Sequence, residues 1–396
     1  MNIDGHFCLT YAVLRAAGFT QSQAYLASTC AETVDINTFE ITIPFVGGSS
    51  YGPKRTFLPT GACDEGMSQN WDPAVVYSSD KMFHFICPGA PVNGAPQTTT
   101  PVTDINLNPV NRTAWDLAFN SGLAALDIHT FGITLHMLAD TFSHQQFYGL
   151  YWNGNAPANY KGLPFSDGDK ADIDALWIAG LTDGHGVMLH LPDSPTLTYT
   201  FTRADGSGDV VVRDNNIEWQ KAIKFLYAYA RWYLKGCVPG QALEVIPQSV
   251  FDGFVNFYSE NSAMFSQSAF SQPWFDTFIN AIANGAFVDL DGNPIKDTLP
   301  AYNEIDIWWQ CFQASSTSPC TTSEPTPAIY DGVIELYNNA PFEYAKFVNT
   351  DMAKFWFGVD KIFVWMVDYL SKIGDPMPLS NPSYVPVANP SLNSGT

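Results

Sequence analysis

The feature that most constrains this chain is a regular spacing of polar residues inside an apolar stretch. His136, Asp140 and His144 follow one another at intervals of four residues. An α-helix turns by about 100° per residue, so these three side chains would share one face. The surrounding residues are mostly apolar or small, namely Phe131, Ile133, Leu135, Met137, Leu138, Ala139, Phe142 and Phe147. The pattern therefore predicts a buried helix with three potential metal ligands on one side.

Two interpretations fit this helix, and the spacing alone favours the first of them. Burying an unpaired carboxylate among imidazoles and hydrophobic side chains is costly, and a divalent metal would pair with all of these groups at once. Alternatively, His129 and His144 could be hydrogen-bonded core histidines, and Asp140 could form a salt bridge with an arginine. The rest of the chain has to decide between these interpretations.

The remaining sequence is typical of a folded, mainly α-helical protein. Charged residues make up 14% of the chain and aromatic residues another 14%, whereas about 25% of an ordinary globular protein is charged. Apolar periodicity and capping residues predict helices. The expected helical ranges are 3–17, from Thr20 or Ser22 to about 33, 113–148 with a break near 120–122, 168–182, 216–235, 248–285, 303–313, 326–340 and 342–373.

Three segments interrupt the helices. Residues 39–110 are rich in Pro, Gly, Thr and Asn, with β-like runs at 41–46 and 74–77, and we expect this loop-rich excursion to shape a site. Residues 194–214 read as an inserted β-hairpin. Residues 376–396 form a Pro/Ser/Asn tail that we expect to be flexible. We therefore expect a catalytic helical domain at 1–215 and an aromatic-rich helical scaffold or lid at 216–375.

The acidic charge limits the partners of the protein. The chain has 18 Lys and Arg against 39 Asp and Glu, for a net charge of −21. Such a chain repels nucleic-acid phosphate and anionic membrane surfaces over long range, which argues against a basic groove for duplex DNA. A substrate phosphate would therefore have to be held by a metal ion.

The sequence says less about the cellular location of the protein and about the redox state of its cysteines. No segment is long and apolar enough to span a membrane, and the N-terminal residues lack the pattern of a signal peptide. The seven cysteines form no C-x-x-C pair; a Cys311–Cys320 bridge is conceivable.

The histidines point to the first half of the chain as the part that carries the site. All seven lie before residue 191. Besides the central helix they include His6 in the first turn of the first helix, His84 in the excursion, and His185 between two glycines. Asp35 falls at the end of the second helix, where a carboxylate opposes the helix dipole and calls for a compensating cation.

Together these residues resemble the zinc-dependent phospholipase C and P1 nuclease superfamily, most closely its phosphatidylcholine-hydrolysing metallophospholipase branch. The resemblance covers residues 1 to about 195 and is most specific in H-F-x-x-T-Y at 6–11 and H-x3-D-x3-H at 136–144. It implies a phospholipase C/P1 nuclease-like helical bundle with about two to three zinc ions. The implied ligands of the first zinc are Asp35, His84, His136 and Asp140.

The same resemblance implies two further zinc positions. Asp140 would bridge to a second zinc held by His6 and the N-terminal region, where Asp4 or the Met1 amine would complete the ligands. His144 and His185 would hold a third zinc. Asp193 would complete its ligand set, with Asp183 or His190 as less favoured alternatives. His129 is expected either beside these ligands, since metal-bound residues usually need hydrogen-bond partners, or in the core, but not among the ligands.

The implied activity is hydrolysis of phosphatidylcholine-like lipids to diacylglycerol and phosphocholine by metal-activated water. Asp35 would coordinate metal and orient or deprotonate that water. Tyr11 and Phe83 could form an aromatic wall for a quaternary ammonium group, or simply belong to the core. The resemblance implies an exported or secreted enzyme that meets its phospholipid at a membrane surface, although a cytoplasmic location is an alternative. A single-strand nuclease and a non-catalytic protein with a structural zinc are the rival functions, and the oligomeric state stays open.

Overall fold

The computed structural model describes residues 4–37, 41–46, 54–57, 60, 82–92, 97–147, 157–161, 191–203, 209–265, 272–299 and 342–374, and it is mainly helical. The helices are η1 (Asp4–Leu9), α1 (Thr10–Ala16), α2 (Gln21–Ile36), α4 (Arg112–Phe119), η3 (Leu123–Ala125), α5 (Ile128–Ser143), α7 (Asn215–Leu234), α8 (Gln248–Glu260), α9 (Ser262–Phe265), α10 (Gln272–Ala283), α13 (Tyr344–Phe347) and α14 (Asp351–Ile373). The helices expected at 168–182, 303–313 and 326–340, the β-like run at 74–77, the Cys311–Cys320 pair and the tail at 376–396 lie outside the described residues.

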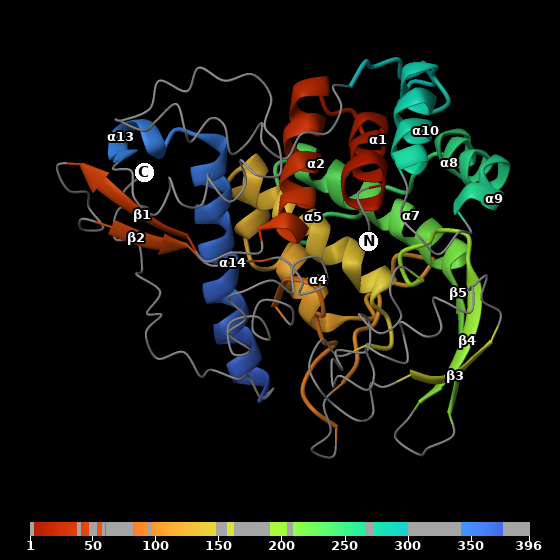
Figure 1. The fold of residues 1–396 in the computed structure, drawn as a ribbon, viewed down its shortest axis with the longest axis horizontal. Coiled ribbons are helices and arrows are strands. Elements are labelled where there is room, and N and C mark those ends of the chain that lie inside the picture. The colour runs from red at the N-terminus through yellow and green to blue at the C-terminus, as the bar shows by residue number, and fades with distance from the viewer. Residues whose placement is uncertain are drawn as a thin grey trace.

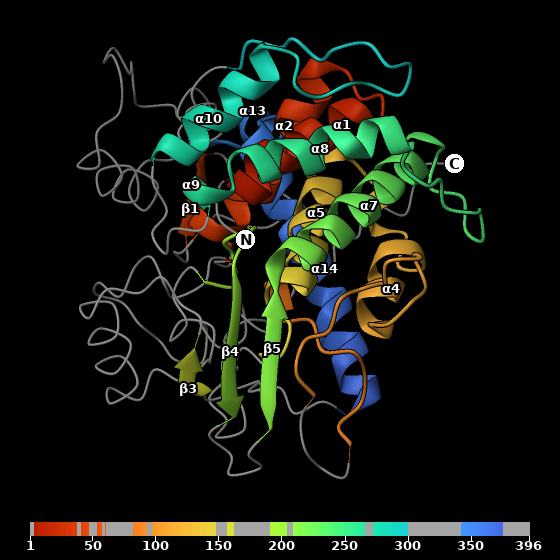
Figure 2. The same cartoon turned by 90° about the vertical axis from the view of Figure 1, so that its right-hand side faces the viewer.

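Helix α5 lies at the centre of the molecule, as the sequence predicts. It packs against α2, α7 and α14, which surround it in Figures 1 and 2. Every residue from 129 to 143 is buried, and the helix begins where the side chain of Asp127 accepts a hydrogen bond from the backbone N–H of Thr130. The polar stripe on this helix is therefore held in the interior.

Two glycines allow neighbouring helices to approach α5 closely. A Cβ atom at Gly132 would lie 2.5 Å from the carbonyl oxygen of Ala27 in α2. A Cβ atom at Gly358 in α14 would lie 2.9 Å from Cδ1 of Ile133. The contact at Gly132 involves backbone, so the packing of α2 on α5 depends on the missing side chain there, whereas the terminal methyl group of Ile133 could shift to relieve the contact at Gly358.

The first helix differs from the prediction of a single helix over 3–17. Residues Asp4–Leu9 form a π-helix, and α1 continues from Thr10. The hydroxyl of Thr10 donates to the carbonyl of Gly5, five residues earlier, at 3.1 Å. A π-turn is wider than an α-turn and is frequent at functional sites. It changes the direction in which His6 points from the helix.

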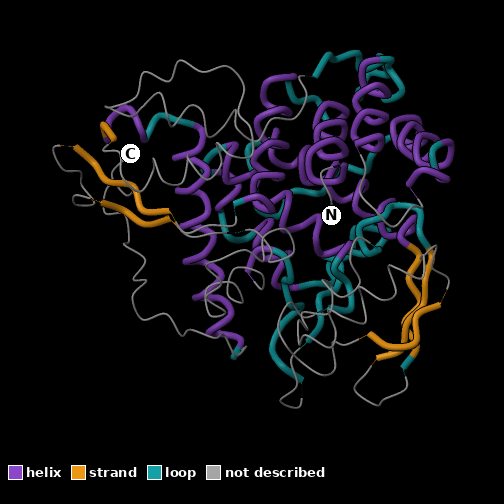
Figure 3. Tube along the Cα trace, in the orientation of Figure 1, coloured by secondary structure: helices purple, strands orange, loops and turns teal. Residues whose placement is uncertain are grey.

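Two three-stranded sheets lie on opposite sides of the helices (Figure 3). In one, β1 (Ile41–Val46) pairs antiparallel with β2 (Lys54–Phe57) and parallel with β6 (Phe342–Glu343). In the other, β4 (Thr198–Arg203) lies between β3 (Pro157–Lys161) and β5 (Val210–Asp214), antiparallel to both. The expected hairpin is thus confirmed, whereas β3, which begins with proline, lacked a strand pattern.

One continuous hydrophobic core contains apolar side chains from both halves of the chain. Phe131 of α5, Tyr229 of α7 and Trp356 of α14 all belong to it. Helices α7 and α14 therefore pack against the N-terminal helices in one core. No helix among the described residues is long and apolar enough to cross a membrane.

Candidate metal centre

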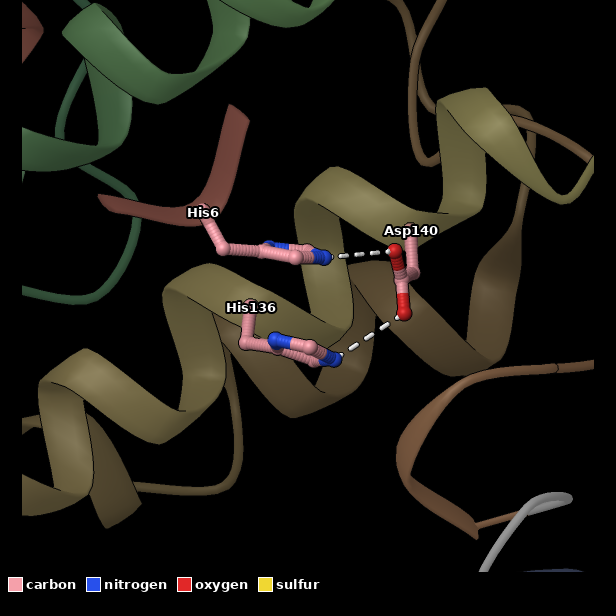
Figure 4. A group of neighbouring side chains, drawn as sticks. All are labelled: His6, His136 and Asp140. Carbon is pink, nitrogen blue, oxygen red and sulfur yellow. Dashed lines mark ion pairs between the residues drawn. The ribbon is translucent and has the colours of Figure 1, made fainter. Parts of the chain in front are cut away.

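The polar stripe of α5 is organised around Asp140. His136 and Asp140 lie one turn apart on the helix, and His144 follows directly as the C-terminal capping residue. The fully buried carboxylate of Asp140 lies within 3.6 Å of a ring nitrogen of each of four histidines, namely His6, His84, His136 and His144. Figure 4 shows His6 and His136 on the same side of this carboxylate. Their rings are stacked, with ring centroids 3.7 Å apart.

Two distant segments, together with α5 itself, bring imidazole side chains to this carboxylate. Nε2 of His6 lies 3.1 Å from Oδ1 of Asp140, and Nδ1 of His84 lies 3.0 Å from Oδ2. Nε2 of His136 also lies 3.0 Å from Oδ2. One oxygen of Asp140 therefore faces His6, while the other faces His84 and His136.

Asp35, in the last turn of α2, completes the group. Its Oδ1 atom lies 3.6 Å from Nδ1 of His84 and 3.5 Å from Nε2 of His136. Two subsets have the ligand spacing of a metal site, namely His6, His136 and Asp140, and Asp35, His84 and His136. We call His6, Asp35, His84, His136 and Asp140 together the His/Asp cluster. Such a cluster could bind a metal ion.

Backbone carbonyl groups decide which imidazole nitrogens can be ligands. Nε2 of His84 lies 2.7 Å from the carbonyl oxygen of Thr60, and Nδ1 of His136 lies 2.8 Å from that of Ala31. A carbonyl oxygen can only accept, so these two nitrogens carry the protons. In the neutral form of each ring, Nδ1 of His84 and Nε2 of His136 carry the lone pairs, and these two atoms lie 3.1 Å apart.

The charges of the cluster also call for a cation. Burial lowers the pKa of His6 well below its usual range and that of His136 to about 4, so both imidazoles are neutral at pH 7. Burial would raise the pKa of Asp140, but electrostatic interaction with His144 first, and then with the N-terminal amine, holds it well below its usual range. Among the described residues, Nδ1 of His6 has no hydrogen-bond partner, and its Nε2 atom faces Oδ1 of Asp140. The ionised carboxylate of Asp140 and neutral imidazole groups therefore meet in a buried space, which fits the donor set of a metal site.

A further pair of possible ligands lies beside the cluster. Nδ1 of His144 donates to the carbonyl of His84 at 2.9 Å, so the neutral ring carries its lone pair on Nε2. That atom lies 4.0 Å from Oδ1 of Asp193, and the ring of Phe85 stacks on the imidazole at 4.6 Å. His185, His190, Asp183, Met1 and the side chain of Asp4 lie outside what the structure describes.

The other predicted site residues have different surroundings. The hydroxyl of Tyr11 donates to Oδ2 of Asp297 at 2.6 Å, which places this group in a structural contact rather than in an open aromatic wall. Phe83 is fully buried in the core. His129, expected beside the ligands, instead pairs with Asp351 of α14 at 2.9 Å and with Asp127 at 3.5 Å.

Sequence reasoning missed the groups that orient the imidazoles. The carbonyls of Ala31 and Thr60 fix the proton positions of His136 and His84. Every residue has a carbonyl group, so no residue type marks these two positions. Only the three-dimensional structure identifies them.

The fold and the cluster define a mainly helical protein with buried His and Asp residues that could hold a metal ion. Residues 1–368 match the model of a family of unknown function, DUF6765, and the chain belongs to that family. No curated protein and no solved structure matches the chain. The family match covers the segments that bear the cluster together with the α7 and α14 scaffold.

Proposed function

We propose that this protein is a zinc-dependent phosphodiesterase of the phospholipase C type, which hydrolyses phosphatidylcholine-like lipids to diacylglycerol and phosphocholine. The observation that carries the proposal is the convergence of five His and Asp side chains from four segments around Asp140. Their order along the chain is the one on which the resemblance to the phospholipase C and P1 nuclease superfamily rests. The proposal includes the bundle type and an exported location, which that resemblance implies.

Asp140 would serve as the bridging ligand. Its two oxygens face different histidines, Oδ1 toward His6 and Oδ2 toward His84 and His136. Imidazole and carboxylate donors without thiolate suit zinc better than they suit calcium or magnesium, which prefer oxygen ligands alone. The protons on Nε2 of His84 and Nδ1 of His136 keep the opposite nitrogens available to the metal.

Asp35 would act on the substrate side of the cluster. Its side chain is 24% exposed, whereas the side chains of His84 and Asp140 are 1% and 0% exposed. This carboxylate therefore lies at the side of the cluster that water reaches, where it would orient a water molecule and accept its proton. Bound zinc would supply the charge that holds the phosphodiester and would lower the pKa of water toward about 7.

The acidic chain favours a zwitterionic lipid over a polyanion as substrate. With a net charge of −21, the protein repels nucleic acid over long range. A choline phospholipid carries a single phosphodiester with a compensating ammonium group, so it experiences little of this repulsion. This difference is our reason to place the lipid before single-stranded nucleic acid.

Hydrolysis of defined substrates tests the proposal. Zinc-loaded protein would be incubated with phosphatidylcholine vesicles, and released phosphocholine would be measured with and without chelator. We expect release that stops with chelator and in His136→Ala, but continues in His129→Gln, whose side chain lies outside the cluster. Hydrolysis of single-stranded RNA or DNA but not of lipid would make the protein a nuclease. No hydrolysis of either substrate by zinc-loaded protein would refute the proposal and favour a structural metal site.

A further inference from the structure

A buried arginine holds the end of the helix that carries the cluster. Arg213 of β5 is only 3% exposed. Its guanidinium donates from Nη2 to the carbonyls of Phe142 and Ser143, at 2.9 and 2.8 Å, and from Nη1 to that of Gln145 at 3.3 Å. These carbonyls flank His144 on both sides. Arg213 therefore fixes the backbone from which the imidazole of His144 projects.

A neighbouring asparagine holds the turn that carries Asp193. Nδ2 of the fully buried Asn215 donates to the carbonyls of Leu191 and Ser194, both at 2.7 Å. Its backbone N–H also donates to the carbonyl of Leu197 at 2.9 Å. Asp193 lies between the first two of these anchor points, so Asn215 limits the movement of its backbone.

Arg213 and Asn215, which we call the clamping residues, are hydrogen-bonded to each other. Nε of Arg213 donates to Oδ1 of Asn215 at 3.1 Å. A continuous set of buried hydrogen bonds thus links the backbone at His144 with the backbone at Asp193. The side chains on these two backbone segments approach each other, with 4.0 Å between Nε2 of His144 and Oδ1 of Asp193.

We propose that Arg213 and Asn215 are positioning residues that together set the separation of His144 and Asp193, and thereby the metal affinity of a position distinct from the His/Asp cluster. The inference rests on the proposed metal centre. It gives the β-hairpin a role in the site, because β5 and the first residue of α7 supply both clamping groups. Neither residue contacts the metal position directly, so both act through the backbone of the ligands.

A cation at the end of a helix also stabilises that helix, so a purely structural role must be separated from positioning. Arg231 of α7 offers a matched control. Its Nη1 donates to the carbonyl of Ala17, at the end of α1, at 2.9 Å, and its Nε pairs with Glu244. Both arginines thus bind carbonyls at a helix C-terminus, but only Arg213 does so beside a predicted ligand.

The test is metal binding to the metal-free full-length chain, measured by calorimetric titration with Zn²⁺ and by the absorption spectrum with Co²⁺. We expect at least two classes of site. Arg213→Met and Asn215→Ala should each weaken one class by about ten- to a hundredfold and leave the other unchanged. Arg231→Met should lower thermal stability with no change in either affinity. If Arg213→Met does not fold, Arg213→Lys and Asn215→Ala provide the same comparison.

A double substitution decides whether Asn215 acts through Asp193. In an Asp193→Ala background, Asn215→Ala should cause no further loss of affinity. Two binding classes that respond to Asn215→Ala no more than to Arg231→Met would overturn the inference and leave the proposed function intact. A single class in the wild type, lost in Asp140→Ala, would also remove only the inference. No metal binding by the wild type would overturn both.

Discussion

Nε2 of His136 lies 3.1 Å from Nδ1 of His84, and in a neutral ring each of these nitrogens carries the lone pair because the opposite nitrogen donates to a backbone carbonyl. Two lone pairs at this distance repel each other unless a cation lies between or beside them. Asp35 and Asp140 bring negative charge to the same point. The fold therefore holds this arrangement at a cost that metal binding would offset, which couples metal binding to stability.

Metal removal should lower the stability of the wild type more than that of cluster variants. A metal present at a thousandfold excess over its dissociation constant stabilises the native state by about 4 kcal/mol. We expect chelator to lower the melting temperature of the wild type clearly, and that of Asp140→Asn little or not at all. Thermal unfolding with and without chelator measures the difference. An equal response of both proteins would show that Asp140 does not bind the metal.

The hydroxyl of Thr60 should matter for the cluster although it touches no ligand. Thr60 Oγ1 donates to the carbonyl of Val34 at 2.9 Å and accepts from Nδ2 of Asn37 at 3.1 Å, which fixes the carbonyl that orients His84. We expect Thr60→Val to cost about 1–3 kcal/mol of unfolding free energy. Metal affinity should fall about ten- to a hundredfold. Thr60→Ser keeps the hydroxyl and should behave as the wild type; a normal affinity in Thr60→Val would contradict this role.

The ion pair of His129 with Asp351 should make stability depend on pH. Burial alone would lower the pKa of His129, but Asp127 and Asp351 outweigh it and raise the pKa. The protonated imidazole therefore stabilises the fold fully below its unfolded pKa of about 6.5, and this contribution is lost as the pH rises through the higher folded value. We expect His129→Gln to cost about 1–2 kcal/mol in mildly acidic solution and less in alkaline solution.

Denaturant unfolding of metal-free wild type and His129→Gln at several pH values measures this contribution. The difference between the two proteins isolates it from the titration of the cluster histidines. A difference that stays constant from acidic to alkaline pH would mean that His129 acts only by packing. Asp351→Asn should reproduce the loss, because Oδ1 of Asp351 accepts from Nε2 of His129 at 2.9 Å.

Close packing of α2 on α5 should be essential for the cluster, since these helices supply Asp35, His136 and Asp140. A Cβ atom at Gly132 would lie 2.5 Å from the carbonyl oxygen of Ala27 and 2.7 Å from Cβ of Cys30. We expect Gly132→Ala to destabilise the protein by about 1–3 kcal/mol or more and to weaken metal binding. Gly253→Ala in α8, where the nearest atom would lie 3.3 Å away, is the control. Equal stability of the two variants would contradict this packing argument.

The sequence predicts the central helix and its ligands because both follow from local spacing. The four-residue intervals of His136, Asp140 and His144 place them on one stripe, and the apolar residues between them require burial. The concentration of histidines before residue 191 indicates His6 and His84 as partners. The structure brings these residues together with Asp35, as the resemblance implies.

Other parts of the site depend on tertiary structure and carry no local signal. The π-turn that directs His6 and the carbonyls that orient His84 and His136 arise only when the segments meet. Arg213 has one sequence signal that could have identified it. It shares an inward-facing side of β5 with Val211, and a buried arginine at an apolar position needs partners.

Metal content per chain tests the central claim most directly. Purified wild type, His136→Ala, Asp140→Ala and the control His129→Gln would be analysed by mass spectrometry after equilibration with zinc. We predict about two to three zinc ions per wild-type and control chain and a sharp fall in both cluster variants. A content of less than about one metal ion per wild-type chain, unchanged by added zinc and by either substitution, would contradict the claim. The His/Asp cluster would then be a group of buried polar side chains that binds no metal.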